Sequence, residues 1–376
     1  MEVPINLAAT AHSISVNYCF EIEFLVAKQR PEDDPYFAIL DRCKDLLVQN
    51  NEPVIICCDP DYDLTQRSRF NSEESGDSDR FGYWNLAPSN TARTKKGAPP
   101  EYDCLKWALA ALRMGLTMHV NSTCRFSVHI EPEGGPLTLL AAKKLTTLVW
   151  ILEKELLLRL CPNSQGVPLR HVKPIDTRSR IALAHWKGQV ETSRPQDPLR
   201  AGIMDQYLPP LHDNITHERL HVVWGAATLQ ELSKGLCCDD GSPSSFAINI
   251  YDDDALNGID PPTVEFRYAL WHPYQQLDAS NYWIRLAINI FKATAYEGFE
   301  FKRYIESIDR TIKGFARGVP SSSRWKILLD KLQLSEDWAG PWEKIVDEYK
   351  DGRFLGYPSI DRQPMSNPIE EFEGYP

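Results

Sequence analysis

Two carboxylates alternate with apolar residues in the segment Phe20-Glu21-Ile22-Glu23-Phe24. Residues i and i+2 of a β-strand point to the same face, so Glu21 and Glu23 would lie side by side. Neighbouring carboxylates repel each other and raise one another's pKa unless a cation neutralises them. Mg²⁺ prefers hard oxygen ligands and commonly acts together with substrate phosphates. The segment therefore indicates a candidate magnesium site on one face of a strand.

The segment Val264-Glu265-Phe266-Arg267-Tyr268 repeats this alternation with a different pair of polar residues. Glu265 and Arg267 would share one face, and the three apolar residues would pack on the other. A guanidinium beside a metal-binding carboxylate suits a phosphate, because it can bind two phosphate oxygens at once. The pair is therefore a candidate phosphate and metal contact.

A third segment, Phe126-Ser127-Val128-His129-Ile130, places Ser127 and His129 on one face in the same way. Three such strands predict one sheet with an apolar face that is covered by helices. The opposite face is predicted to be open and polar, and to carry the chemistry.

The rest of the chain must position these strands. Apolar periodicity predicts helices at 35–49, 103–115, 137–159, 279–296, 300–317, 325–332 and 341–349. Further strands are predicted at 54–58 and 246–251, a short strand followed by a helix at 222–236, and flexible polar loops at about 66–100 and 162–210. Strands scattered among helices, without strict β-α alternation, predict an α+β fold with a mainly antiparallel sheet.

The predicted organisation has one large domain and two C-terminal segments. Residues 1–318 form the catalytic domain, and residues 319–350 form a helical C-terminal extension. Residues 351–376 are rich in proline, glycine and acidic residues, which is typical of a disordered tail.

Composition limits the possible partners. The 376 residues carry a net charge of −11, which argues against nucleic acid or an anionic membrane as a partner. We find no apolar run of about 18 residues that could span a membrane and no secretory signal segment. The nine cysteines include two adjacent pairs but no zinc-binding spacing. We therefore expect a reducing, cytoplasmic location.

The strand motifs, taken in order, resemble the fungal-type amidoligase family, whose distant relatives are glutamate–cysteine ligase and glutamine synthetase. The family's opening strand resembles residues 18–24, its histidine strand resembles residues 124–129, and its Glu-Phe-Arg motif is matched by Glu265-Phe266-Arg267. Between the motifs, Glu153 resembles the glutamate of a long helix and Asn249 the asparagine of a strand. A helix that contains tryptophan follows, and the resemblance spans residues 14–296.

The resemblance implies an ATP- and Mg²⁺-dependent ligase with a curved, mainly antiparallel sheet like that of glutamine synthetase. Such an enzyme joins a small-molecule or peptide carboxylate to an amine through an acyl phosphate. Carried over by position, the implied Mg²⁺ ligands are Glu21, Glu23, His129 and Glu265. Arg267 would contact the transferred phosphate, Glu265 would share in catalysis, and Glu23 and Arg267 would contact ATP.

Several positions depart from the family pattern. Ser127 stands where the family has its first histidine, Arg125 replaces a glycine, and Pro88 stands where a metal-binding aspartate is usual. After the long helix, Cys161 to Ser164 lacks the usual histidine and arginine. One metal site is therefore intact and a second is eroded. This leaves open a catalytically degenerate relative that binds a ligand or partner through the same cleft.

A separate motif, His217-Glu218-Arg219-Leu220-His221, matches the pattern of zinc metalloproteases. On a helix the two histidines would share a face and bind zinc, with Glu218 as general base. The residues 222–225 favour a strand, and Glu231 is the one candidate for a third ligand. A chance match is the favoured interpretation, and a zinc protease stays an alternative.

Overall fold

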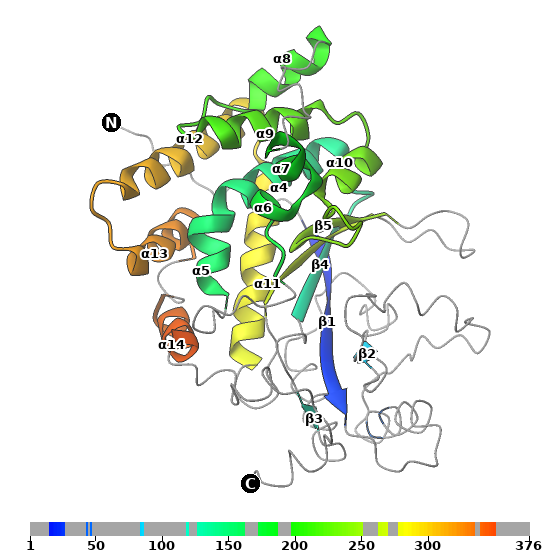
Figure 1. The fold of residues 1–376 in the computed structure, drawn as a ribbon, viewed down its shortest axis with the longest axis vertical. Helices are drawn as coiled ribbons and strands as arrows, with labels where there is room; N and C mark the ends of the chain where they lie inside the picture. Colours follow the sequence, from blue (N-terminus) through cyan, green and yellow to red (C-terminus); the bar gives the residue numbers. More distant parts are fainter. Residues whose placement is uncertain are drawn as a thin grey trace, which may run out of the picture.

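The computed structural model describes residues 15–26, 43, 46, 83–85, 118–119, 126–161, 172–186, 197–250, 262–269, 277–334 and 339–350. The fold is mixed α+β: most described residues are helical, and the helices gather on one side of an antiparallel sheet (Figure 1). This confirms the predicted α+β class with an antiparallel sheet. The predicted elements at 54–58 and 103–115, the predicted tail and most of the predicted helix 35–49 and loop 66–100 lie outside the described residues.

The sheet brings the three strand motifs together. Its strand order is β2-β1-β4-β6-β5, and β3 pairs with β1 beside this path. The strands are β1 (Val16–Val26), β2 (Tyr83–Asn85), β3 (Met118–His119), β4 (Phe126–Pro132), β5 (Phe246–Asn249) and β6 (Thr263–Ala269). Each pairing is antiparallel. The motif strands β1, β4 and β6 are therefore immediate neighbours, although they are far apart in the sequence.

The register aligns the polar residues of these strands. Glu21 lies opposite Ser127, and His129 lies opposite both Cys19 on one side and Glu265 on the other. Residues paired across a sheet point to the same face, so these positions share one face. Between the Phe126 and Val128 pairings the register shifts by one residue, which leaves an extra residue of β6 opposite Ser127. The bulge locally changes the direction of the Arg267 region.

The apolar face of the sheet packs on the long helix α11 (Leu277–Lys292), and a second long helix, α4 (Leu139–Leu152), packs on α11. Thr138 begins α4, because its side chain accepts a hydrogen bond from the Ala141 N–H. The α-helix continues as one π-helical turn, η4 (Glu153–Leu157), and ends in α5 (Leu158–Leu160). The predicted helix 137–159 is confirmed.

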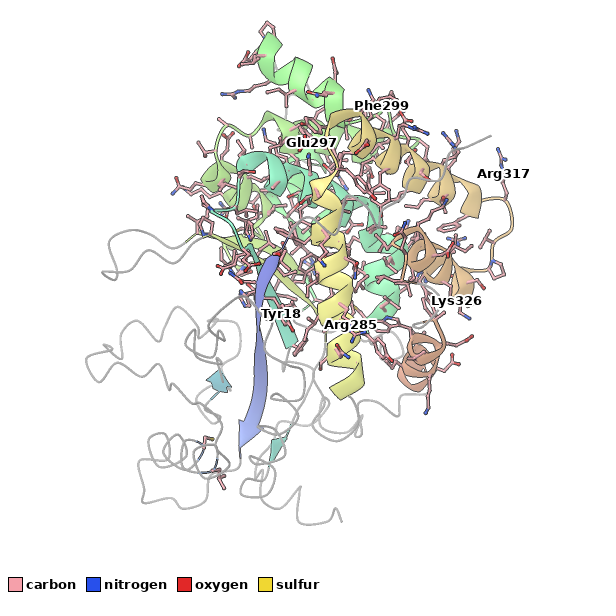
Figure 2. The ribbon with its side chains drawn as sticks, turned by 180° about the vertical axis from the view of Figure 1, so that it is seen from behind. Tyr18, Arg285, Glu297, Phe299, Arg317 and Lys326 are labelled. Atoms are coloured by element: carbon pink, nitrogen blue, oxygen red, sulfur yellow. The ribbon has the colours of Figure 1, made fainter. Side chains whose placement is uncertain are left out.

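Helix α11 lies alongside the sheet and contacts β4 and β6. Tyr268 of β6 stacks on Trp283 of α11, with ring centroids 6.3 Å apart. Tyr18 of β1 faces the same helix, near enough for the charge of Arg285 to act on its hydroxyl (Figure 2). These contacts hold three strands against one helix.

Two sequence predictions are wrong between residues 162 and 236. The predicted loop contains the helices α6 (Ile175–Arg178), α7 (Arg180–Trp186) and α8 (Pro198–Tyr207). The predicted short strand is the end of helix α9 (Asn214–Gly225), which α10 (Leu229–Leu236) follows. Val223 and Trp224 are buried, and the Trp224 indole donates a hydrogen bond to Thr147 of α4. Tertiary packing therefore outweighs the strand propensity of this segment.

The C-terminal helices match their predictions. They are the 3-10 turn η5 (Ala293–Ala295), α12 (Gly298–Phe315), α13 (Ser321–Lys331) and α14 (Ala339–Lys350). Arg324 of α13 pairs with Glu155 of η4 at 3.2 Å, and Trp342 of α14 packs edge-on against Trp283. The predicted C-terminal extension therefore shares the core of the preceding domain.

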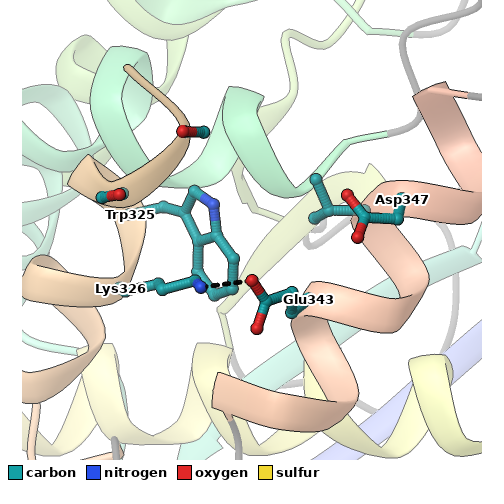
Figure 3. Close-up of a pocket in the computed structure, with 7 residues that line it drawn as sticks. Trp325, Lys326, Glu343 and Asp347 are labelled. Atoms are coloured by element: carbon teal, nitrogen blue, oxygen red, sulfur yellow. Dashed lines mark hydrogen bonds and ion pairs between the residues drawn. The ribbon is translucent and has the colours of Figure 1, made fainter. Parts of the chain in front are cut away.

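A small polar hollow lies between α13 and α14, where Lys326 and Glu343 form an ion pair at 2.5 Å (Figure 3). No residue of the three strand motifs lines it. Among the described helices, none is both long and apolar enough to cross a membrane.

Candidate functional site

Glu265, in the middle of β6, is the centre of the polar cluster. Its side chain is completely buried. Oε1 accepts a hydrogen bond from Arg267 Nε at 2.5 Å and lies 3.6 Å from His129 Nε2. Oε2 accepts a hydrogen bond from Asn249 Nδ2 at 3.0 Å. Three neighbouring strands thus direct polar groups at one carboxylate.

The charges around Glu265 keep it ionised. Burial by itself would raise the pKa of this carboxyl, but the positive charge of Arg267, followed by His129, outweighs burial and lowers the pKa to about 2. The hydrogen bonds from Arg267 and Asn249 act in the same direction. A fixed negative charge therefore lies inside the protein at neutral pH.

Arg267 contacts Glu265 through Nε alone. Its two terminal Nη groups form no hydrogen bond with any residue that the structure describes. The side chain retains 14% of its accessible surface. The Nη groups are therefore the part of this cluster that can bind an incoming anion.

Ser127 and Glu131 extend the polar row along β4. Both side chains are buried, and Glu131 accepts a hydrogen bond from Asn17 of β1 at 3.1 Å. The Ser127 hydroxyl is buried and has no hydrogen-bond partner within the described part of the chain. A buried hydroxyl left in this way is a candidate contact for a bound group.

Sequence reasoning missed two members of this cluster as site residues. Glu131 continues the period-two alternation of Ser127 and His129, so the signal was present one step beyond the motif. Only the family resemblance pointed to Asn249, because no local sequence pattern connects this residue of β5 with Glu265 of β6.

The predicted openness of the polar face is wrong at the centre of the sheet. Ser127, His129, Glu131 and Glu265 are all buried. Two of these groups have a hydrogen-bond donor on the next strand, Asn17 for Glu131 and Asn249 for Glu265. Arg267 and Asn249, which are partly exposed, lie at the boundary of this buried row.

Glu21 and Glu23 lie on β1, with their backbone positions set by the register. Glu21 pairs with Ser127 and Glu23 pairs with Asn85 of β2. Both belong to the face that carries His129 and Glu265, because Cys19, Glu21 and Glu23 alternate along the strand. The structure does not describe their side chains, so their role as metal ligands stays a prediction. Pro88 and Arg125 also lie outside the described residues.

Glu153 lies on the opposite, helical side of the sheet. Its two carboxylate oxygens accept hydrogen bonds from the Ile175 and Asp176 N–H groups, at 2.8 and 2.9 Å, and from the Tyr268 hydroxyl at 2.5 Å. Burial and the nearby charge of Asp176 raise the pKa of Glu153 to about 8, although these hydrogen bonds oppose the rise. The residue connects η4, α6 and β6, and is a structural carboxyl rather than part of the polar cluster. Cys161 is similarly placed, with its thiol directed at the Tyr268 carbonyl.

The second motif, at residues 217–221, lies on helix α9. The two histidines face each other, with Nε2 atoms 3.1 Å apart. Glu231, the candidate third zinc ligand, instead accepts a hydrogen bond from the Ala227 N–H at 2.7 Å. Among the described residues no group of three or more metal-ligating side chains is found, at this motif or in the sheet.

The sheet cluster therefore combines, on the adjacent strands β4 and β6, an ionised buried carboxylate, an imidazole, a guanidinium and a hydroxyl. Among the described residues, nothing binds the two Nη groups of that guanidinium or the hydroxyl. No protein-family model, curated protein or solved structure matches this chain.

Proposed function

We propose that this protein is an ATP- and Mg²⁺-dependent carboxylate–amine ligase with a glutamine-synthetase-like sheet. One observation carries the proposal: the antiparallel register of β1, β4 and β6 places Glu21, His129 and Glu265 on one face of neighbouring strands. Each motif alone is common in unrelated strands, but their adjacency and shared face are not expected by chance.

The described residues fit a magnesium-bound nucleotide. Glu265 is ionised, as a metal ligand must be, and the Ser127 hydroxyl is available for a bound group. Glu21 and Glu23 would add two carboxylates to the same face, which are the hard oxygen ligands that Mg²⁺ prefers. Glu21, Glu23, His129 and Glu265 are thus the residues proposed to hold the metal ion.

The chain's own residues would act mainly by position and charge. Mg-ATP, when bound, would supply the phosphoryl group that activates a substrate carboxylate toward an amine. Glu265 holds the Arg267 guanidinium by its Nε, and the two Nη groups would bind the phosphate. Buried surroundings would strengthen the attraction between the guanidinium and the phosphate, because a low dielectric screens charges less than water does.

Replacing Glu21 by glutamine tests the proposal. The change removes one metal-binding charge and keeps the size of the side chain. We expect ADP release, measured with Mg-ATP and pooled carboxylic acids and amines, to fall by roughly 100-fold or more, since metal stabilisation of a phosphoryl transition state is worth several kcal/mol.

The matched control is Glu133→Gln, the same substitution at an exposed turn residue directly after β4. It should release ADP at the wild-type rate. Equal turnover in wild type and Glu21→Gln would refute the assigned role. If Mg-ATP raises the melting temperature of the wild type and no ADP is released, the ligase proposal fails and the non-catalytic binding alternative replaces it.

A further inference from the structure

The paired histidines of helix α9 are independent of the sheet cluster. The helix begins at Asp213, whose carboxylate accepts hydrogen bonds from the Ile215 and Thr216 N–H groups. His217 and His221 are four residues apart and therefore lie on one face of the helix. The helix packs on α4, α7 and α8.

The geometry of the pair is that of a two-point chelate. The ring centroids are 4.4 Å apart, the ring planes are inclined by 65°, and the Nε2 atoms are 3.1 Å apart. Two imidazole nitrogens bound at the usual Zn–N distance would be separated by about 2.9 Å at a right angle and about 3.3 Å at the tetrahedral angle. The observed separation falls between these values without any movement of either ring.

The surroundings select Nε2 as the coordinating atom. The Nδ1 atoms of both histidines are buried, whereas both side chains as a whole are partly exposed. The two Nε2 atoms lie within hydrogen-bond distance of each other, so an ion bound to both would replace that hydrogen bond.

The nearby charges favour a cation. The negative charges of Glu218 and of Asp309, on α12, act on the His217 ring. A cation at Nε2 would be attracted by both charges.

We propose that His217 and His221 form a binding site for one divalent transition-metal ion of the imidazole-preferring class, such as Zn²⁺, Ni²⁺ or Cu²⁺. Glu231 is engaged by the Ala227 N–H and no three-ligand group occurs among the described residues, so the proposal assigns two protein ligands to the ion. The site needs no proteolytic activity, and it does not depend on the proposed ligase function.

The test compares zinc binding by the full chain and three variants, with Zn²⁺ titrated against a chromophoric chelator. The chain has nine histidines and nine cysteines, so the difference between variants is the informative quantity. His217→Ala and His221→Ala should each weaken one zinc equivalent by at least about tenfold, because loss even of a residue that only supports a ligand costs that much. His272→Ala is the matched control, since His272 belongs neither to the motif at 217–221 nor to the three strand motifs. It should titrate like the wild type.

A second measurement does not depend on the variants. One equivalent of Cu²⁺ added to the wild type should give an electron paramagnetic resonance spectrum with nitrogen splitting from two imidazoles. Affinity should rise from Co²⁺ to Ni²⁺ to Cu²⁺, the order expected of nitrogen ligands. The proposal is overturned if both pair variants bind zinc like the wild type, if His272→Ala loses the same equivalent, or if the copper spectrum shows no imidazole nitrogen.

Discussion

Replacing Arg267 by methionine should destabilise the protein by about 3 to 5 kcal/mol at pH 7, the cost of breaking a buried ion pair from one side. Methionine preserves much of the aliphatic volume of the side chain but removes the guanidinium. The Glu265 carboxylate would then stay buried without its strongest cationic partner. Urea denaturation of the purified variant measures the change in the free energy of unfolding.

Two further variants make this result specific. Arg317→Met, at an exposed position after α12, should change stability by no more than about 0.5 kcal/mol. Arg267→Met combined with Glu265→Gln should be more stable than Arg267→Met alone, because the second change removes the uncompensated charge. If Arg267→Met is as stable as Arg317→Met, the result contradicts the Arg267–Glu265 ion pair.

The Arg267–Glu265 pair also makes the free energy of unfolding fall at low pH. The pKa of Glu265 is about 2 in the folded protein and 4.5 for an ordinary glutamate, so the folded state binds this proton more weakly than the unfolded state. The resulting stabilisation is complete above pH 4.5 and is lost as the pH falls toward 2. In Arg267→Met the pKa of Glu265 should rise, so less stability should be lost over this range.

Replacing Glu153 by alanine should cost a similar amount, about 3 to 5 kcal/mol, because it leaves two buried donors and one partly buried donor without their acceptor. These donors are the N–H groups of Ile175 and Asp176 and the hydroxyl of Tyr268. The loss would detach the start of α6 from η4 and loosen β6 at the back of the sheet. Lys154→Ala, at the adjacent exposed position, should leave the unfolding midpoint nearly unchanged.

Glu153 also predicts a pH dependence of the opposite sign. Because its pKa of about 8 lies above the ordinary 4.5, the folded state holds the proton more tightly than the unfolded state. That stabilisation is present below pH 4.5 and is lost as the pH rises toward 8. Glu153→Gln cannot titrate, so its urea midpoint should fall less than that of the wild type between pH 5 and pH 8. If the urea midpoints of the wild type and Glu153→Gln change equally with pH, this carboxyl does not control stability in that range.

Local pattern was sufficient for the elements with strong periodicity. The alternation in β1, β4 and β6 and the apolar spacing of α4, α11 and α12 predicted both the type of element and its approximate bounds. Local pattern failed where packing outweighs propensity. The Val222-Val223-Trp224 run favours a strand by composition, but burial of Val223 and Trp224 and the hydrogen bond to Thr147 retain it in α9.

The sequence alone determined which face of each strand is polar, because side-chain direction alternates along a strand whatever its neighbours are. It therefore predicted that Glu21 and Glu23, Ser127 and His129, and Glu265 and Arg267 form matched pairs. Only the tertiary structure decided that these strands are adjacent, that Glu265 is buried and ionised, and that Asn249 and Glu131 belong to the cluster. The reason is that strand order, register and burial depend on contacts between residues far apart in the chain, which no local period encodes.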